Sequence, residues 1–272
     1  MWHHLPVARR EPPRAKSPSS PAESAPTTAA QPVAEYEPDG YHGVCAVCGH
    51  VQTFVRQKVA IRETYPCEKC RGSLREREQA RAILWCHSSA ASTLSEFVHT
   101  GVARGLRIYE PGTMGPFRKH LASLAGYTRS AYYGDPSDAT AEVPHQSLEA
   151  LTFSDDSFDL VLTSDILEHV RRPEAAFSEI ARVLRRGGHH VFTVPMQDPV
   201  RPKTVSRIEL DGDRDIHVRP AVYHGRSIVY NDFGLDIVSV LSRVGFSTYL
   251  MNAATPSTVA NAAITLVTQK VA

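Results

Sequence analysis

Residues 148–195 read "LEALTFSDDSFDLVLTSDILEHVRRPEAAFSEIARVLRRGGHHVFTVP". Within this stretch, Phe158–Thr163 is a continuous apolar run, which is typical of a buried strand. A helix with a regular apolar stripe should start near Pro173 and end at Gly187 and Gly188. His190–Val194 then forms the next strand. This order of strand, helix and strand predicts two neighbouring parallel strands of an α/β sheet.

The alternation of strands and helices continues on both sides of this unit. A helix with apolar spacing is expected over 117–124 and another over 237–244. Seven strands are expected, at residues 106–110, 127–133, 146–148, 158–163, 190–194, 246–252 and 264–270. The pattern predicts an α/β fold with a doubly wound seven-stranded sheet, parallel except for an antiparallel C-terminal hairpin.

Composition divides the 272-residue chain into three parts. Residues 1–37 are rich in Pro, Ser, Ala and Thr, and we expect a disordered tail. Residues 38–86 should form a small module with a linker helix, and residues 100–272 the α/β domain. An insertion over 196–233 interrupts the alternation and should lie over the carboxyl edge of the sheet, where it can form an acceptor pocket.

The small module contains two C-x-x-C pairs separated by a segment long enough for a hairpin. Four thiolates brought together by two such turns suit a structural Zn²⁺ ion. Disulfides or unliganded core cysteines are the alternative. The predicted zinc ligands are Cys45, Cys48, Cys67 and Cys70, whereas Cys86 should pack in a following helix, residues 73–86.

Charge and hydropathy give the chain no special affinity for polyanions or membranes. The formal net charge is +1, from 30 basic and 29 acidic side chains. We therefore expect no nucleic-acid partner and no membrane partner, and a cytoplasmic location. The arginines at 75, 77 and 81 lie near one side of the helix that follows the module, and a solvated face is the favoured interpretation over a phosphate contact.

The segment 148–195 resembles the class I S-adenosylmethionine-dependent methyltransferases. The matching motifs are "SFDLV", "LEHV", "P-x-x-A-F-x-E-I-x-R-V-L" and "GG", in the order and spacing of the large group that includes ubiquinone-type O-methyltransferases. The preceding "CRGSLRER" is similar to the zinc segment fused to some bacterial members. The resemblance, which covers residues 106–270, implies a Rossmann-like sheet and S-adenosylmethionine as cofactor.

The resemblance also assigns the loop after the first strand, "EPGTMGP", to the cofactor. Glu110 and Gly112 match the first two fixed positions of the family's acid-x-Gly-x-Gly-x-Gly motif, with Thr113 and Gly115 in the same loop. Glu110 would hold the amino group of the methionine moiety, and Gly112 would let the backbone approach. Met114 and Pro116 replace the later glycines.

Further cofactor contacts follow from the same resemblance. Tyr133 or Ala131 stands where the family carries an acid for the ribose hydroxyls, so Asp135 is the candidate, with a turn before Pro136 as its alternative role. The expected adenine contacts are Gln146, Ser147 and Leu148, and those at the methionine and sulfonium end are Ser164 and Asp165.

The segment "DILEH" offers a second metal site. Asp165, Glu168 and His169 would share one helical face and could bind Mg²⁺ or another divalent metal, as similar clusters do in some 2'-O-methyltransferases. The favoured alternative is that Glu168 and His169 only cap and brace the helix. The candidate catalytic bases are His169, His224 and Tyr223.

These observations predict an S-adenosylmethionine-dependent methyltransferase. The expected acceptor is a hydroxyl of a small molecule or a glycan. One alternative is an RNA methyltransferase whose zinc module docks the RNA, and another is a non-catalytic binding protein that retains the fold. The sequence predicts neither the acceptor's identity nor the oligomeric state.

Overall fold

The computed structural model describes residues 39–87, 89–112, 114–196, 199–252 and 263–271. The predicted tail, residues 1–37, lies outside these residues, as does Thr113. Tyr36–Ala272 forms one compact unit. No helix in the described part of the chain is long and apolar enough to span a membrane.

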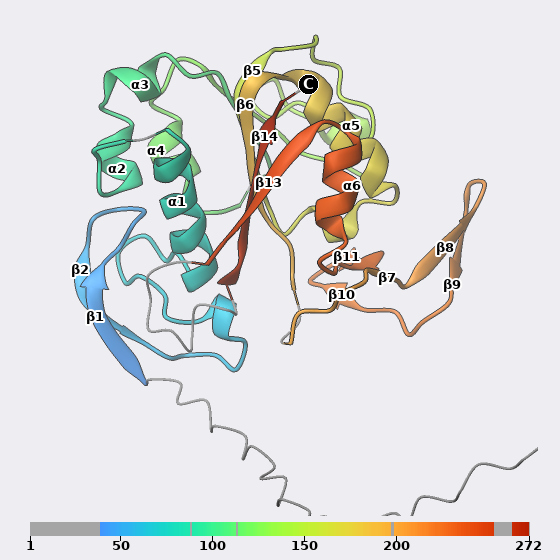
Figure 1. Ribbon diagram of the computed structural model, residues 1–272, viewed down its shortest axis with the longest axis horizontal. Helices are drawn as coiled ribbons and strands as arrows, with labels where there is room; N and C mark the ends of the chain where they lie inside the picture. The colour runs from blue at the N-terminus through green and yellow to red at the C-terminus, as the bar shows by residue number, and fades with distance from the viewer. Residues whose placement is uncertain (1–38, 88, 113, 197–198, 253–262, 272) are drawn as a thin grey trace, which may run out of the picture. The chain divides into compact units, whose positions relative to one another are not determined.

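A sheet of six strands runs through this unit, in the order β13-β14-β6-β5-β3-β4 (Figure 1). The strands β3 to β6 are parallel, whereas β14 runs antiparallel to both β6 and β13. The predicted α/β fold class with its antiparallel C-terminal hairpin is confirmed. The strand bounds are β3 (Ile108–Pro111), β4 (Tyr127–Ser130), β5 (Phe158–Ser164), β6 (Leu184–Thr193), β13 (Phe246–Met251) and β14 (Thr265–Lys270).

The described residues give this sheet six strands where seven were expected. Residues 146–148 were predicted as the third strand, but next to β4 the chain makes only an isolated bridge between Ala131 and His145. The side chain of Gln146 bonds to both the hydroxyl and the backbone N–H of Thr152. These bonds close a tight loop, so the chain turns away before a strand can form.

Helices cover both faces of the sheet, because successive strand residues point to opposite sides. Ile108 packs against one face together with α1 (Leu74–Cys86) and α4 (Arg118–Leu121). Tyr109 packs against the other face. The helices α5 (Pro173–Val183) and α6 (Ile237–Arg243) lie on that face (Figure 1). The helix α5 ends before the two predicted glycines, and β6 begins directly at Leu184.

The segment that precedes the sheet shares a hydrophobic core with it. An antiparallel hairpin of β1 (Gly40–Val44) and β2 (Val51–Val55) leads through η1 (Ile61–Glu63) into α1. Cys45 and Phe54 belong to the same buried cluster as Ile108 and Leu160 of the sheet. Two short helices, α2 (Leu94–Phe97) and α3 (Gly101–Arg104), connect α1 to β3.

The helix α1 is buried rather than solvated. Its N-terminus carries a capping box, in which the Glu76 carboxylate accepts from the Ser73 backbone N–H at 2.8 Å. Arg77 is fully buried, and its Nη2 donates to the Tyr41 hydroxyl and to the Tyr65 carbonyl oxygen. Arg75 is buried as well. The expectation of a solvated arginine face is therefore wrong, because α1 lies between the hairpin and the sheet.

The insertion after β6 folds into short strands and hairpins. It contains β7 (Val205–Ser206), β8 (Ile208–Asp211), β9 (Arg214–His217), β10 (Tyr223–His224), β11 (Ser227–Ile228) and β12 (Asn231–Asp232). The β8–β9 hairpin projects from the rest of the insertion (Figure 1). The β10–β11 hairpin is tied to η3 (Leu167–His169), because His169 Nδ1 donates to the carbonyl oxygen of Ile228 at 2.6 Å.

We expect Gly126→Ala to destabilise the fold. A Cβ atom at Gly126 would lie 2.2 Å from the carbonyl oxygen of Leu106, so the backbone at the start of β3 or β4 would have to move. Such overpacking should lower the free energy of unfolding by about 2 kcal/mol or more. Gly101→Ala is the matched control, because a Cβ there meets no atom within 4 Å. Equal urea-unfolding free energies for the two variants would contradict this account.

Candidate functional site

A cavity of about 140 Å³ lies at the carboxyl edge of the sheet. Three separate segments line it: the loop after β3, the end of β5, and the middle of α1. In open α/β sheets, ligands bind at this edge, next to the first strand. The lining residues are Gln79, Glu110, Pro111, Gly112, Met114, Phe117, Leu162, Ser164 and Ile166.

Glu110 places a buried carboxyl group in this cavity. It stands in β3, and its carboxylate accepts a hydrogen bond from the Tyr127 hydroxyl at 2.6 Å. Burial raises the pKa of Glu110 to about 7, although the bond from Tyr127 and the charges of Arg118 and Arg129 lower it. The group can therefore exchange its proton for a cation near neutral pH.

Gly112 turns the chain away from β3 directly above this carboxyl group. Its backbone has a φ of +115°, a conformation that L side chains rarely adopt, and its N–H donates to the Ser130 carbonyl oxygen at 2.7 Å. Gly115 has a similar φ of +117°. Met114, in the place of a family glycine, is 89% exposed, so its side chain does not fill the loop.

Asp165 follows β5 and is held by two arginines from the N-terminal segment. Arg62 forms a bidentate pair with its carboxylate at 2.7 and 2.9 Å, and Arg75 Nε lies 3.2 Å from the same group. Burial would raise the pKa of Asp165, but the charges of Arg75 and Arg62 outweigh it and lower that pKa. Asp165 also has a positive φ of 50°, a strained conformation that this ion pair stabilises.

The neighbouring Ser164 is bonded to α1. The Ser164 hydroxyl accepts from Arg75 and donates to the Gln79 side-chain oxygen at 2.7 Å. The Gln79 amide nitrogen donates to the carbonyl oxygens of Thr163 and Val191 at 3.0 and 3.1 Å. The helix α1 thus holds the ends of β5 and β6 in place. Sequence reasoning missed Arg62, Arg75 and Gln79, because no local pattern marks a polar side chain that reaches another segment.

The other residues predicted to contact the cofactor do not line this cavity. Asp135 is exposed and accepts from the Ser137 N–H, which is the turn role given above as its alternative. Tyr133 donates its backbone N–H to His145 Nδ1 at 3.2 Å. Gln146 is bonded to Thr152 and Ser147 accepts from the Glu149 N–H, whereas Leu148 is buried in the core beside α5.

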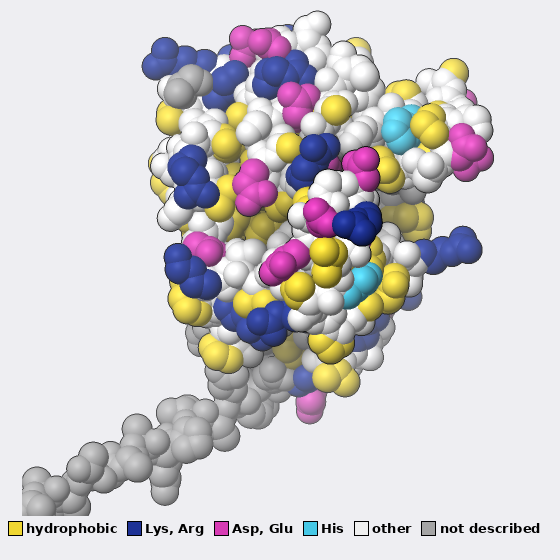
Figure 2. Space-filling model, turned by 90° about the vertical axis from the view of Figure 1, so that its right-hand side faces the viewer, with side chains coloured by type: hydrophobic (Ala, Val, Ile, Leu, Met, Phe, Trp, Pro, Cys, Tyr) yellow, Lys and Arg dark blue, Asp and Glu magenta, His cyan; other side chains and the backbone are white. Residues whose placement is uncertain are grey.

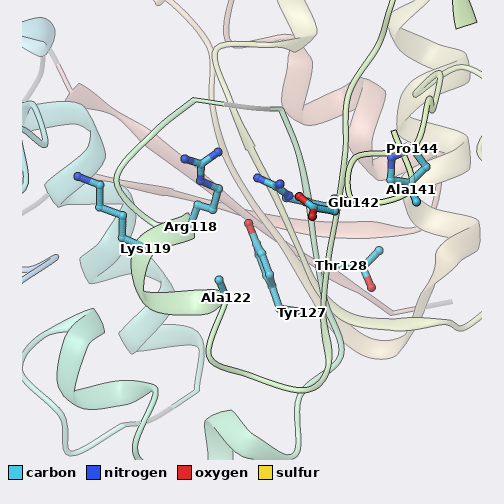
Figure 3. Close-up of a pocket in the computed structure, with 9 residues that line it drawn as sticks. Arg118, Lys119, Ala122, Tyr127, Thr128, Ala141, Glu142 and Pro144 are labelled. Carbon is cyan, nitrogen blue, oxygen red and sulfur yellow. The ribbon is translucent and has the colours of Figure 1, made fainter. Parts of the chain in front are cut away.

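A larger hollow of about 790 Å³ lies at the edge strand β4. It is lined by Arg118, Lys119, Arg129 and Glu142, among others. Arg118 and Glu142 stand on either side of the Tyr127 hydroxyl (Figure 3). None of the predicted site residues lines this hollow. We therefore place the candidate site at the smaller cavity, where Glu110, Gly112 and Ser164 come together.

The four predicted zinc ligands form a compact cluster in the N-terminal segment. The Sγ atoms of Cys45 and Cys70 lie 3.6 Å apart, as do those of Cys48 and Cys67. All four ligand atoms lie within 4.8 Å of one another, and the cysteines are free. Zn–S bonds of about 2.3 Å in a tetrahedron separate the sulfur atoms by about 3.8 Å, so the cluster fits Zn²⁺.

Matching turns present these cysteines. The Gly49 N–H donates to the Cys45 carbonyl oxygen and the Arg71 N–H to that of Cys67, both at 2.8 Å. Gly49 and Arg71 both have positive φ, at 77° and 67°. The two C-x-x-C turns therefore have the same backbone shape, as the spacing predicts.

The three residues of the predicted second metal cluster, Asp165, Glu168 and His169, do not all come together in the structure. Asp165 forms ion pairs with Arg62 and Arg75. It precedes η3, so it does not share a helical face with Glu168. His224 stands there instead: the ligand atoms of Glu168, His169 and His224 lie within 4.8 Å of one another. The Glu168 carboxylate, with Oε1 3.5 Å from His224 Nδ1, raises the pKa of His224. The third candidate base, Tyr223, is 58% exposed.

Comparison with known proteins supports the resemblance found in the sequence. Residues 122–192 match the family model described as a methyltransferase domain. Over that segment the predicted family resemblance is confirmed. The matched segment includes β4, β5 and α5, and therefore Ser164 on one side of the cavity.

A curated relative is the sarcosine/dimethylglycine N-methyltransferase of Halorhodospira halochloris, 38% identical over 74 residues. The match spans 27% of this chain and about a quarter, 26%, of the relative.

Two solved structures align with part of this chain. An S-adenosylmethionine-dependent methyltransferase from Mesorhizobium loti is 16% identical, with a TM-score of 0.43 over 61% of this chain and 91% of the other. The 1,6-didemethyltoxoflavin-N1-methyltransferase of Burkholderia thailandensis, with bound 1,6-didemethyltoxoflavin and S-adenosylhomocysteine, is also 16% identical. Its TM-score is 0.39 over 66% of this chain and 77% of the other.

We expect Cys67→Ser to abolish tetrathiolate metal binding. Protein reconstituted with Co²⁺ should show intense thiolate-to-cobalt charge-transfer absorption, which the variant should lose. Because Cys45 and Cys67 also belong to the buried core, the variant should unfold at a lower temperature. Cys86→Ser is the control: Cys86 lies apart at the end of α1, and burial raises its pKa to about 12. An unchanged spectrum for Cys67→Ser would refute the site.

Proposed function

We propose that the protein is an S-adenosylmethionine-dependent methyltransferase that methylates a hydroxyl oxygen of a small molecule or glycan. One observation carries the proposal. A buried carboxyl group, a glycine turn and the end of β5 surround one cavity at the carboxyl edge of the sheet. The methyltransferase-domain match covers the β5 side of that cavity.

The chemistry of the cavity suits the methionine end of the cofactor. Glu110 can accept the cationic amine, and Gly112 leaves room for close approach of the backbone. The methionine end of the cofactor would occupy this cavity of about 140 Å³. The adenosine would extend along the end of β4, toward residues 133–148.

In the proposed reaction, the acceptor oxygen attacks the methyl carbon in line with the carbon–sulfur bond. The bonding electron pair passes to sulfur, which leaves as the neutral thioether of S-adenosylhomocysteine. The acceptor's proton is lost in the same process, assisted at the His169–His224 pair, whose His169 comes three residues after the cavity-lining Ile166. The protein's main contribution would be alignment of the donor and acceptor.

The proposed role of zinc is structural: the segment that carries the cysteines also carries Arg62, which contacts Asp165. Arg62 lies between the second strand of the module and Cys67, and it holds Asp165 beside the cavity. The zinc-binding segment would thus keep the β5 end in place for the cofactor. It contributes no open coordination position, because four cysteines complete the shell.

An amine acceptor is the second candidate. The curated relative that aligns with this chain over 74 residues is an N-methyltransferase. A neutral amine needs no deprotonation before attack, so this reading leaves the His169–His224 pair without a task. For that reason we favour the hydroxyl acceptor.

RNA is a weaker candidate. The face shown in Figure 2 mixes basic with acidic side chains rather than gathering the basic ones. Affinity for nucleic acid depends mainly on basic contacts with phosphates, and the net charge of this chain is only +1. The non-catalytic reading is favoured only by Met114 and Pro116 in place of the family glycines.

The direct test is a transfer screen with tritium-labelled methyl donor. Small hydroxylated compounds, glycans, amines and RNA serve as acceptors. Label should pass to a hydroxylated acceptor, and alkaline stability of the product separates an ether from an ester. Labelled amines would move the proposal to N-methylation. No transfer together with no binding of S-adenosylhomocysteine would support the scaffold reading.

Cofactor binding should strengthen as the pH rises through 7. The pKa of Glu110 is raised to about 7 by burial, so below that pH a bound amine must displace a proton. The apparent affinity for S-adenosylhomocysteine should fall about fivefold from pH 7 to pH 6. Glu110→Gln should bind more weakly and without this pH dependence, measured by calorimetry. A pH-independent wild type would contradict the assigned role.

The same substitution separates binding from folding. The folded-state pKa of Glu110 lies above its unfolded value of about 4.3, so ionisation removes stability as the pH rises toward and through 7. At pH 8, Glu110→Gln should therefore unfold at the same or a higher temperature than the wild type. A variant that binds less and melts lower would indicate a merely structural carboxyl group.

A further inference from the structure

We propose that Glu168, His169 and His224 bind a divalent first-row transition metal such as Zn²⁺, at a site separate from the four cysteines. The three ligand atoms lie within 4.8 Å of one another. They come from η3 and from the β10–β11 hairpin, far apart in the sequence. Only the role of the metal in catalysis rests on the proposed methyltransferase function.

Glu168 is the strongest evidence for a missing cation. Its side chain is fully buried, and neither carboxylate oxygen has a hydrogen-bond partner within the described residues. A buried carboxylate without hydrogen bonds is costly, and such groups are normally paired or bound to metal. Glu168 Oε1 lies 3.5 Å from His224 Nδ1 and 3.7 Å from His169 Nε2.

His169 is oriented as a metal ligand commonly is. Its Nδ1 lies 2.6 Å from the carbonyl oxygen of Ile228, and a carbonyl oxygen can only accept. The proton of the neutral ring therefore stays on Nδ1, and the lone pair of Nε2 faces Glu168. Metal-bound histidines usually donate their other ring N–H to such an acceptor, which fixes the tautomer.

The distances fit a common metal ion. Two ligands that each lie about 2.1 Å from Zn²⁺ at a tetrahedral angle are about 3.4 Å apart. The observed separations from Glu168 Oε1, 3.5 and 3.7 Å, are close to this value. The His169 and His224 rings lie nearly perpendicular, at 88°, with centroids 5.1 Å apart, so both can direct a nitrogen toward one point.

Two imidazoles and one carboxylate favour a first-row transition metal over Mg²⁺, which prefers oxygen ligands. Three protein ligands also leave at least one coordination position open, unlike the four cysteines. His224 is half exposed, so this position can be reached from solvent. The site therefore fits a metal that binds an external oxygen ligand.

The location connects this metal to the acceptor. Glu168 and His169 come two and three residues after Ile166, which lines the cavity. A hydroxyl oxygen bound to the metal would lose its proton to solvent more readily. The resulting alkoxide would attack the methyl carbon as the carbon–sulfur bond breaks toward sulfur. The inference thus specifies the acceptor as an oxygen ligand of the metal.

The test is a calorimetric titration of Zn²⁺ into full-length protein whose cysteine site is already loaded with zinc. The wild type should bind one further equivalent. Glu168→Gln and His224→Ala should each weaken that binding at least about tenfold. His217→Ala is the matched control, because His217 is an exposed histidine of the same insertion and lies outside the cluster.

Thermal unfolding provides a second measurement. Zn²⁺ should raise the melting temperature of the wild type and of His217→Ala but not that of Glu168→Gln. Without added metal, Glu168→Gln should melt no lower than the wild type, because neither carboxylate oxygen accepts a hydrogen bond within the described residues. This rules out misfolding as the cause of lost binding.

The proposal is overturned if the wild type binds no further Zn²⁺, or if Glu168→Gln binds it as the wild type does. In that case Glu168 and protonated His224 form only an internal ion pair. Binding of S-adenosylhomocysteine is measured on the same samples. If S-adenosylhomocysteine does not bind but Zn²⁺ does, the proposed function is wrong and the metal site stands. If Zn²⁺ does not bind but S-adenosylhomocysteine does, the metal site is wrong and the proposed function stands.

Discussion

The ion pair between Asp165 and the arginines at 62 and 75 is the interaction on which the site depends. It joins the zinc-binding segment to the carboxyl end of β5, where the chain adopts a positive φ. The pair is partly shielded from solvent, so removing one partner would leave the other charge without compensation. The N-terminal segment is therefore part of the site's wall, although its cysteines lie elsewhere.

This ion pair also decides which carboxyl group is available to a ligand. Glu110 and Asp165 both stand near the cavity, yet their environments move their pKa values in opposite directions. Asp165 is neutralised by two arginines, and its pKa is lowered. Glu110 has a tyrosine hydroxyl as its hydrogen-bond partner, and burial raises its pKa to about 7. A cationic amine would gain most from the carboxyl group that has no bound guanidinium, which is Glu110.

The sequence predicted the features that depend on local pattern. The apolar run of β5, the stripe of α5 and the two C-x-x-C turns each follow from residues close together in the chain. The contacts of Arg62 and Gln79 could not be predicted in this way. Each contact joins distant parts of the sequence. Arg62 and Asp165 are 103 residues apart, and Gln79 and Thr163 are 84 residues apart. Helical spacing likewise grouped Asp165 with Glu168, whereas the fold pairs Glu168 with His224.

The glycine loop illustrates how such long-range contacts can replace a local motif. Gly112 keeps the positive φ that the turn after β3 requires, so the loss of the later glycines leaves the first bend intact. Met114 is largely exposed at the rim of the cavity, and Phe117 is buried in the core beside α1. The α1 side chains Gln79 and Arg75 then complete the wall at the β5 end. A phosphate would need a cradle of several backbone N–H groups, but an amine needs one carboxyl group. The altered loop is therefore compatible with a cationic ligand held by Glu110, because that ligand depends on fewer of the missing glycines.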